Sequence, residues 1–171
     1  MRNGARRSLL IASILMVMVT LPGSVAAKGP EPVPNGQTVG LEIVYLPPGV
    51  KVREPKPGDI TINNTVSGNC GWASMWVYDV GVETARFDAD AGSSQGPIVR
   101  ADWYIDWSNN DTGLNGAFWG TTTQFSPTWG VKRQGWVDSG LVFGKLTTLV
   151  VTLYNGTVCQ GLAPWDWEQV N

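Results

Sequence analysis

The chain contains no histidine among its 171 residues. Histidine is the usual base that activates serine and cysteine nucleophiles, the commonest metal ligand, and the one side chain that normally titrates near neutral pH. Its absence excludes histidine-dependent triad hydrolases, histidine metal centres and histidine pH switches. Carboxylates, lysine and tyrosine remain as the groups that could carry chemistry.

Cysteine is almost absent as well, since Cys70 and Cys159 are the only two. Two thiols without histidine do not make a common zinc site. With no third thiol to compete, we predict one intramolecular disulfide in an oxidising compartment. It would close a loop of 89 residues, and the chain-entropy model values such a loop at about 4–5 kcal/mol.

Clusters of basic residues are also missing. The first 27 residues hold three of the 12 basic residues and none of the 14 acidic ones, so the rest of the chain carries a formal charge of about −5. Its lysines and arginines occur singly. We therefore expect neither nucleic acid nor an anionic membrane as a partner.

Residues 1–27 have the pattern of a secretory signal peptide. Three arginines precede an apolar run over residues 9–21, and Val25-Ala26-Ala27 supplies small residues for cleavage. The run is short for a membrane span, so we predict a secreted, extracellular protein with no span in the mature chain. Arg6-Arg7 leaves twin-arginine export open beside the general route, and either leader fits a bacterial source.

A proline-rich segment, residues 28–59, follows the signal. One β-like run, Leu41 to Leu46, lies inside it. Proline is tolerated at sheet edges and in linkers but not in central strands. The segment is therefore either an extended arm that adds one edge strand or a disordered linker.

Residues 60–171 alternate short runs of Val, Ile, Thr, Trp and Tyr with clusters of Gly, Asn, Asp and Ser. No apolar period long enough for a helix occurs. Strands are expected at 60–66, 71–79, 83–90, 97–107, 115–125, 129–138, 145–154 and 165–170. This spacing predicts an all-β, antiparallel β-sandwich of jelly-roll or immunoglobulin-like type, or a barrel, with one disulfide.

Alternation along the strands predicts which side chains form the core. In 97–107 one face carries two tryptophans among aliphatic residues and the other carries charged residues. In 145–154 the aliphatic residues again alternate with polar ones. The predicted core positions are Val99, Ala101, Trp103, Ile105, Trp107, Leu149, Val151 and Leu153.

The strand after Cys70 shows aromatic residues on its polar side. Trp72, Trp76 and Tyr78 alternate with an aliphatic face, and Trp136 shares a polar strand face with Lys132. Exposed tryptophan suggests a binding surface, because it is costly on a monomer. The alternative is that a second layer buries these rings, since tryptophan is usually largely buried.

Chemical signals in the sequence are weak. Asp88 with Asp90, and Asp102 with Asp106, could in principle form the carboxylate pair of a glycosidase. The run 106–113 is rich in oxygen-bearing side chains but lacks the spacing of a calcium loop, so we interpret it as a turn. We assign no catalytic residue, metal or cofactor.

The composition therefore favours a secreted, non-catalytic module that binds a polysaccharide or cell-envelope polymer, with Trp72, Trp76, Tyr78 and Trp136 as stacking platforms. A structural, protein-interaction or inhibitor module is the first alternative, and a small carboxylate glycosidase is the second.

Overall fold

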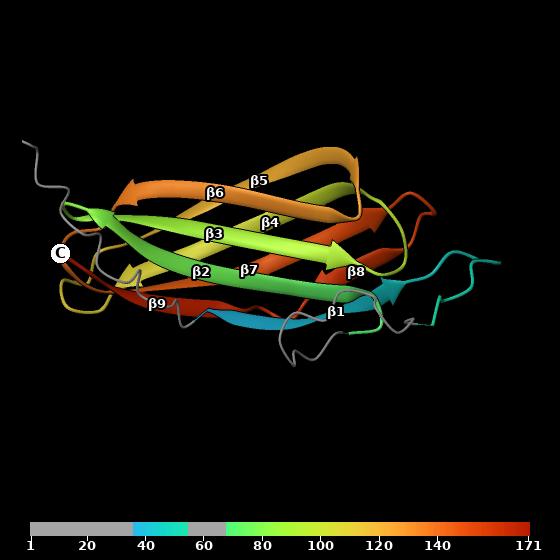
Figure 1. Ribbon diagram of the computed structural model, residues 1–171, viewed down its shortest axis with the longest axis horizontal. Coiled ribbons are helices and arrows are strands. Elements are labelled where there is room, and N and C mark those ends of the chain that lie inside the picture. Colours follow the sequence, from blue (N-terminus) through green and yellow to red (C-terminus); the bar gives the residue numbers. More distant parts are fainter. Residues whose placement is uncertain (1–35, 55–67) are drawn as a thin grey trace, which may run out of the picture. The chain divides into compact units, whose positions relative to one another are not determined.

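A computed structural model describes residues 36–54 and 68–171 as strands and their connections (Figure 1). These residues contain no helix with the length and apolarity to cross a membrane. The predicted signal peptide, the strand expected at 60–66 and much of the proline-rich segment lie outside the described residues.

The all-β prediction is confirmed, and the strands lie close to the expected ranges. They are β1 (Gln37–Tyr45), β2 (Gly71–Gly81), β3 (Thr84–Ser93), β4 (Ile98–Asn109), β5 (Asn115–Ser126), β6 (Thr128–Trp136), β7 (Gly140–Leu153), β8 (Val158–Gly161) and β9 (Trp165–Val170). The short strand β8 was not anticipated, because its four residues are too few for a clear alternation.

All the strands belong to one antiparallel sheet with the order β5-β4-β7-β8-β1-β2-β3-β6. The long strand β7 pairs with β4 along one edge, and its other edge pairs first with β9 and then with β8. The sheet folds over itself, so that β2 and β3 pass in front of β4 and β7 in Figure 1. The result is two layers of a nearly closed sheet, an architecture between a sandwich and a barrel.

Strand β1 corrects one expectation. The run near residue 41 was expected to add at most an edge strand, but β1 pairs with β2 on one side and with β8 on the other. The prolines of this region do not prevent this, because Pro47 and Pro48 follow the strand and every residue within it keeps its N–H group. The β domain therefore includes residues before position 60.

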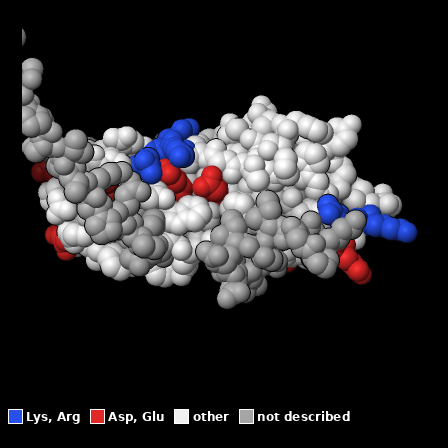
Figure 2. Space-filling model, viewed as in Figure 1, with Lys and Arg blue, Asp and Glu red and all other residues white. Residues whose placement is uncertain are grey.

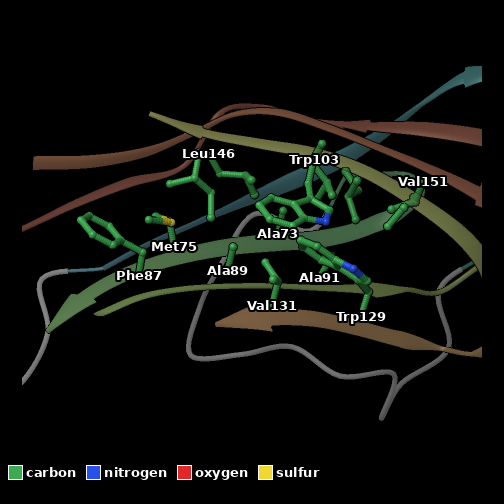
Figure 3. Packing of buried hydrophobic residues seen from close by; sticks show 14 of the residues in the cluster. Ala73, Met75, Phe87, Ala89, Ala91, Trp103, Trp129, Val131, Leu146 and Val151 are labelled. Carbon is green, nitrogen blue, oxygen red and sulfur yellow. The ribbon is translucent and has the colours of Figure 1, made fainter. Parts of the chain in front are cut away.

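The core lies between the two layers, and both layers contribute side chains to it. Figure 3 shows Ala73, Met75 and Phe87 from the β2–β3 layer facing Trp103 and Leu146 from the opposite layer. Ring contacts cross the same space, with centroids 6.4 Å apart for Trp103–Trp129 and 5.6 Å apart for Phe87–Phe118. The sheet is thus held closed mainly by apolar burial across the layers.

The predicted core positions are confirmed with two adjustments. Ala101, Trp103, Ile105 and the three aliphatic residues Leu149, Val151 and Leu153 are buried. Val99 is only partly buried, because a β-bulge between Ile98 and Arg100 shifts the alternation and puts Ile98 into the core instead. Trp107 is half-buried and packs against the edge of the core.

The predicted disulfide between Cys70 and Cys159 is present, and both cysteines are fully buried. Cys70 precedes β2 and Cys159 lies in β8, while β1 runs between these two strands. The bond therefore ties together two strands that are not neighbours in the sheet.

Candidate binding surfaces

The predicted aromatic residues of β2 lie on the outer side of that strand. Ala73, Met75 and Val77 point into the core with no exposed surface. Trp72 and Trp76 alternate with them and are half-buried, as is Tyr78. The alternation was therefore predicted correctly, but these rings are less exposed than a free platform would be.

Glycines explain part of this burial. Trp72 pairs across the strands with Gly92 of β3, and its indole occupies the space that a Cβ at Gly92 would need. Trp76 lies in the same way against Gly36. Tyr78 is covered by a guanidinium, since the Arg86 carbon lies 4.4 Å from the ring centre. Each of these rings is thus partly covered by other residues of its own domain.

Trp136 is the most exposed of the four predicted residues, at 58%. It ends β6, opposite Thr84, and its indole N–H donates a 3.0 Å hydrogen bond to Glu83 Oε2. Trp72 lies level with Thr128 at the other end of β6. The four predicted residues therefore share one outer face, formed by β2, β3 and β6, without forming one cluster.

Charged residues occupy the middle of this face. Asp88 is 5% exposed and contacts Arg86 Nε at 3.1 Å and Lys132 Nζ at 3.7 Å. Figure 2 shows basic and acidic side chains side by side here, on an otherwise largely uncharged surface. Burial, and then the charge of Asp88, raise the pKa of Asp90.

A second outer face, formed by β4, β5 and the end of β7, carries aromatic residues that the sequence analysis did not select. Tyr104 and Trp119 are stacked, with centroids 6.0 Å apart and planes 16° apart. Phe125 and Tyr154 form an edge-to-face pair at 5.3 Å. The exposed fractions are 38% for Tyr104, 69% for Trp119, 67% for Phe125 and 72% for Tyr154. We call these four residues the outer aromatic face.

Polar side chains lie between the two aromatic pairs. The Arg100 guanidinium donates two 2.8 Å hydrogen bonds to the two oxygens of Asp102, and the Thr121 hydroxyl donates to the same carboxylate. The hydrogen bond from Arg100, followed by that from Thr121, lowers the pKa of Asp102. Thr123 and Thr152 flank Arg100 on the neighbouring strands. The surface between the two aromatic pairs therefore offers hydroxyl, carboxylate and guanidinium groups in fixed positions.

The sequence does hold a signal for this face. Trp103 and Trp107 of β4 lie opposite Gly120 and Gly116 of β5, and a Cβ at Gly120 would lie 2.9 Å from Trp103 Cζ2. The glycines of β5 therefore mark its core side, where the large indoles need room. Trp119, which lies between them, must point outward.

The interpretation of residues 106–113 as a turn holds only for its second half, because residues 106–109 are the end of β4 and the turn begins at Asn110. Asn109 is 1% exposed, and its amide donates to three successive carbonyls at residues 137–139. Asn109 Oδ1 accepts hydrogen bonds from the N–H groups of Asp111 and Thr112, and Asp111 Oδ2 accepts one from Leu141. These side chains fasten the β4–β5 turn to the start of β7. In the described part of the chain, no three histidine, cysteine or acidic residues lie together as metal ligands.

In comparison with known proteins, the chain matches no family model, and no curated protein is similar enough to count as a relative. The functional argument therefore depends on the two surfaces alone.

Proposed function

We propose that this chain is a secreted, non-catalytic module that binds a polysaccharide or cell-envelope polymer through exposed aromatic residues, chiefly those of the outer aromatic face. One observation carries the proposal. Two contacting aromatic pairs lie on one face of the sheet, and three of their four rings are more than 60% exposed. Exposed apolar clusters with a polar surround are typical of interaction sites.

The chemistry of the face suits a sugar polymer. Pyranose rings have apolar faces that stack on indole and phenyl groups, and their hydroxyls need hydrogen-bond partners. Trp119 and Phe125 supply apolar surface, while Asp102, Arg100 and Thr121 supply fixed acceptors and donors beside it. Aromatic groups also bind at low entropic cost, because they have few rotatable bonds.

The face formed by β2, β3 and β6 is the alternative site for the same ligand, and it carries Trp72, Trp76, Tyr78 and Trp136. Trp136 is the member that is free to contact a ligand, given its 58% exposure. The other three contact glycines or Arg86 with part of their rings. This face is therefore the weaker of the two candidate sites.

Two features of the chain support secretion as part of this proposal. The leader has the pattern of a secretory signal peptide and fits a bacterial source. The buried Cys70–Cys159 bond supports an oxidising destination, since cytosolic thiols are normally kept reduced.

Pull-down tests this proposal. Residues 28–171 would be incubated with insoluble cellulose, chitin, xylan, mannan and peptidoglycan, and the bound fraction measured. We expect retention on at least one of these polymers, and its loss in the double variant Trp119→Ala/Phe125→Ala. Trp136→Ala is the matched control, because it removes an equally large exposed indole from the other face. No retention on any polymer, or full retention of the double variant, would contradict the proposal.

A protein-interaction or inhibitor module is the second candidate, and the two ends of the sheet favour it. Strands β5 and β6 each pair on one side only within the described residues. Such edges offer backbone N–H and C=O groups to an extended partner strand. Recovery of a stoichiometric protein complex, together with no polymer binding, would select this candidate.

A further inference from the structure

We infer that the outer aromatic face binds a linear, uncharged glycan in extended form, with one sugar-binding station at Tyr104–Trp119 and another at Phe125–Tyr154. This inference rests on the proposed function and specifies the class of ligand. It also states that the two stations are filled by one chain.

The spacing of the stations sets the length of the ligand. Trp119 and Phe125 are six positions apart on β5, and their side chains point to the same outer face. At about 3.3 Å per residue they are separated by about 20 Å, roughly four units of an extended pyranose chain. A mono- or disaccharide can occupy only one station, whereas a longer chain reaches both.

The path between the stations is a continuous row of polar groups. Thr121 and Thr123 lie between the two aromatic residues of β5, and Arg100 and Asp102 lie opposite them on β4. The outer edge of β5 has no partner strand in the described part of the chain. A straight polymer can therefore lie along β5 with its hydroxyls toward these side chains.

Charge on the face indicates a neutral ligand. Arg100 and Asp102 neutralise each other in a two-point ion pair. Beyond Tyr104, Asp106 lies opposite Lys145, so the next pair of charges is balanced as well. A polyanion would find no uncompensated cation here, and a polycation would find no uncompensated anion.

Calorimetry with oligosaccharides of increasing length tests the inference. Residues 28–171 would be titrated with β-1,4-linked glucose oligomers from disaccharide to hexasaccharide, and with the corresponding mannose, xylose and N-acetylglucosamine series. Polygalacturonate provides the polyanionic comparison. In at least one neutral series, we expect affinity to rise steeply where the chain first spans both stations, and to level off beyond that length.

Single variants show whether the two stations act together. Trp119→Ala and Phe125→Ala should each lower the affinity for the hexasaccharide by about tenfold or more, and each should abolish the dependence on length. Trp136→Ala should leave the length profile unchanged.

The outcomes separate the inference from the proposed function. Binding of a neutral polymer without a length dependence, or with only one of the two variants affected, overturns the two-station inference but leaves polymer binding in place. Tighter binding of polygalacturonate than of every neutral series overturns the neutral-ligand part. Failure to bind any glycan overturns both.

Discussion

Trp103 and Trp136 represent the two environments that tryptophan occupies in this chain. Trp103 is 4% exposed and packs against Trp129 across the core, and the Arg133 guanidinium carbon lies 4.9 Å from the centre of its ring. Trp136 keeps more than half of its surface in solvent. The same residue type therefore contributes to stability in one position and is available for contact in the other.

Replacement by alanine should separate the two environments. Trp103→Ala leaves a cavity between the layers, so we expect it to lower the free energy of unfolding by about 3–5 kcal/mol. Trp136→Ala loses one exposed hydrogen bond to Glu83 and should cost less than about 1 kcal/mol. Chemical denaturation of both variants measures the difference. Equal losses would show that Trp136 is part of the core.

Asp166 is a buried acid at a junction between strands. It has no exposed surface, and its Oδ2 accepts a 2.8 Å hydrogen bond from the N–H of Val77. Val77 lies where β2 extends beyond the first residue of β1, Gln37. Burial raises the pKa of Asp166 above its ordinary value of 3.8. The pKa of Glu168 is raised too, first by burial and then by the charge of Asp166.

These raised pKa values set the direction of a pH effect. Above the ordinary value of 3.8, Asp166 holds more protons in the folded chain than in the unfolded chain, and Glu168 behaves in the same way. The contribution of these two groups to stability therefore falls as pH rises through their raised pKa values. Asp166→Asn removes one titrating group and one charge beside Glu168, and should make this fall shallower. Urea unfolding between about pH 3 and pH 8 compares the two proteins. Parallel profiles would mean that Asp166 does not contribute.

At the level of strands, alternation predicted the core sides of β2, β4, β6 and β7, because the aliphatic residues of each lie mostly on one face. The prediction from alternation was wrong at Val99, because the β-bulge between Ile98 and Arg100 could not be predicted from the sequence pattern. It gave no clear prediction for β5, whose core side carries Phe118 as its one large apolar residue, between two glycines. The outer aromatic face was therefore not predicted. Which side of β5 faces outward becomes clear only when its glycines are seen opposite the tryptophans of β4.

The pairing of β4 with β5 makes Gly120 a sensitive position. An added methyl group at Gly120 would lie 2.9 Å from Trp103 Cζ2, so Gly120→Ala must displace a buried ring. We expect a loss of about 1–3 kcal/mol. Thr123→Ala, at an exposed site on the same strand, should change stability by less than about 0.5 kcal/mol. Thermal and chemical denaturation check both, and a neutral Gly120→Ala would show that Trp103 can move without cost.

Across the whole molecule, the disulfide restrains the unfolded chain over 89 residues. Replacement of both cysteines by serine should lower the free energy of unfolding by about 2–5 kcal/mol. The variant should remain folded at 25 °C, because the two cysteines are a small part of the buried core. An unchanged unfolding midpoint would show that the loop is already restrained by residual structure in the unfolded chain.

Binding by the whole molecule should respond little to salt and pH, despite the formal charge of about −5 on the chain after the leader. The proposed contacts are stacking and hydrogen bonds to a ligand that carries no charge. The charges nearest to them are internally paired, and the lowered pKa of Asp102 keeps that carboxylate ionised at neutral pH. We expect retention on the best polymer to change less than about threefold between low and high salt and between about pH 5 and pH 8. A steep fall with salt would indicate an ionic ligand.

Hydroxyl-radical footprinting tests the central claim most directly, because it reports each aromatic side chain in the unaltered protein. The oxidation rates of Trp119, Phe125, Tyr154 and Trp136 would be compared with and without a saturating soluble form of the bound polysaccharide. The account predicts strong protection of the first three residues and an unchanged rate at Trp136. Protection of Trp136 with unchanged rates at Trp119 and Phe125 would place the ligand on the face formed by β2, β3 and β6, and would contradict the account.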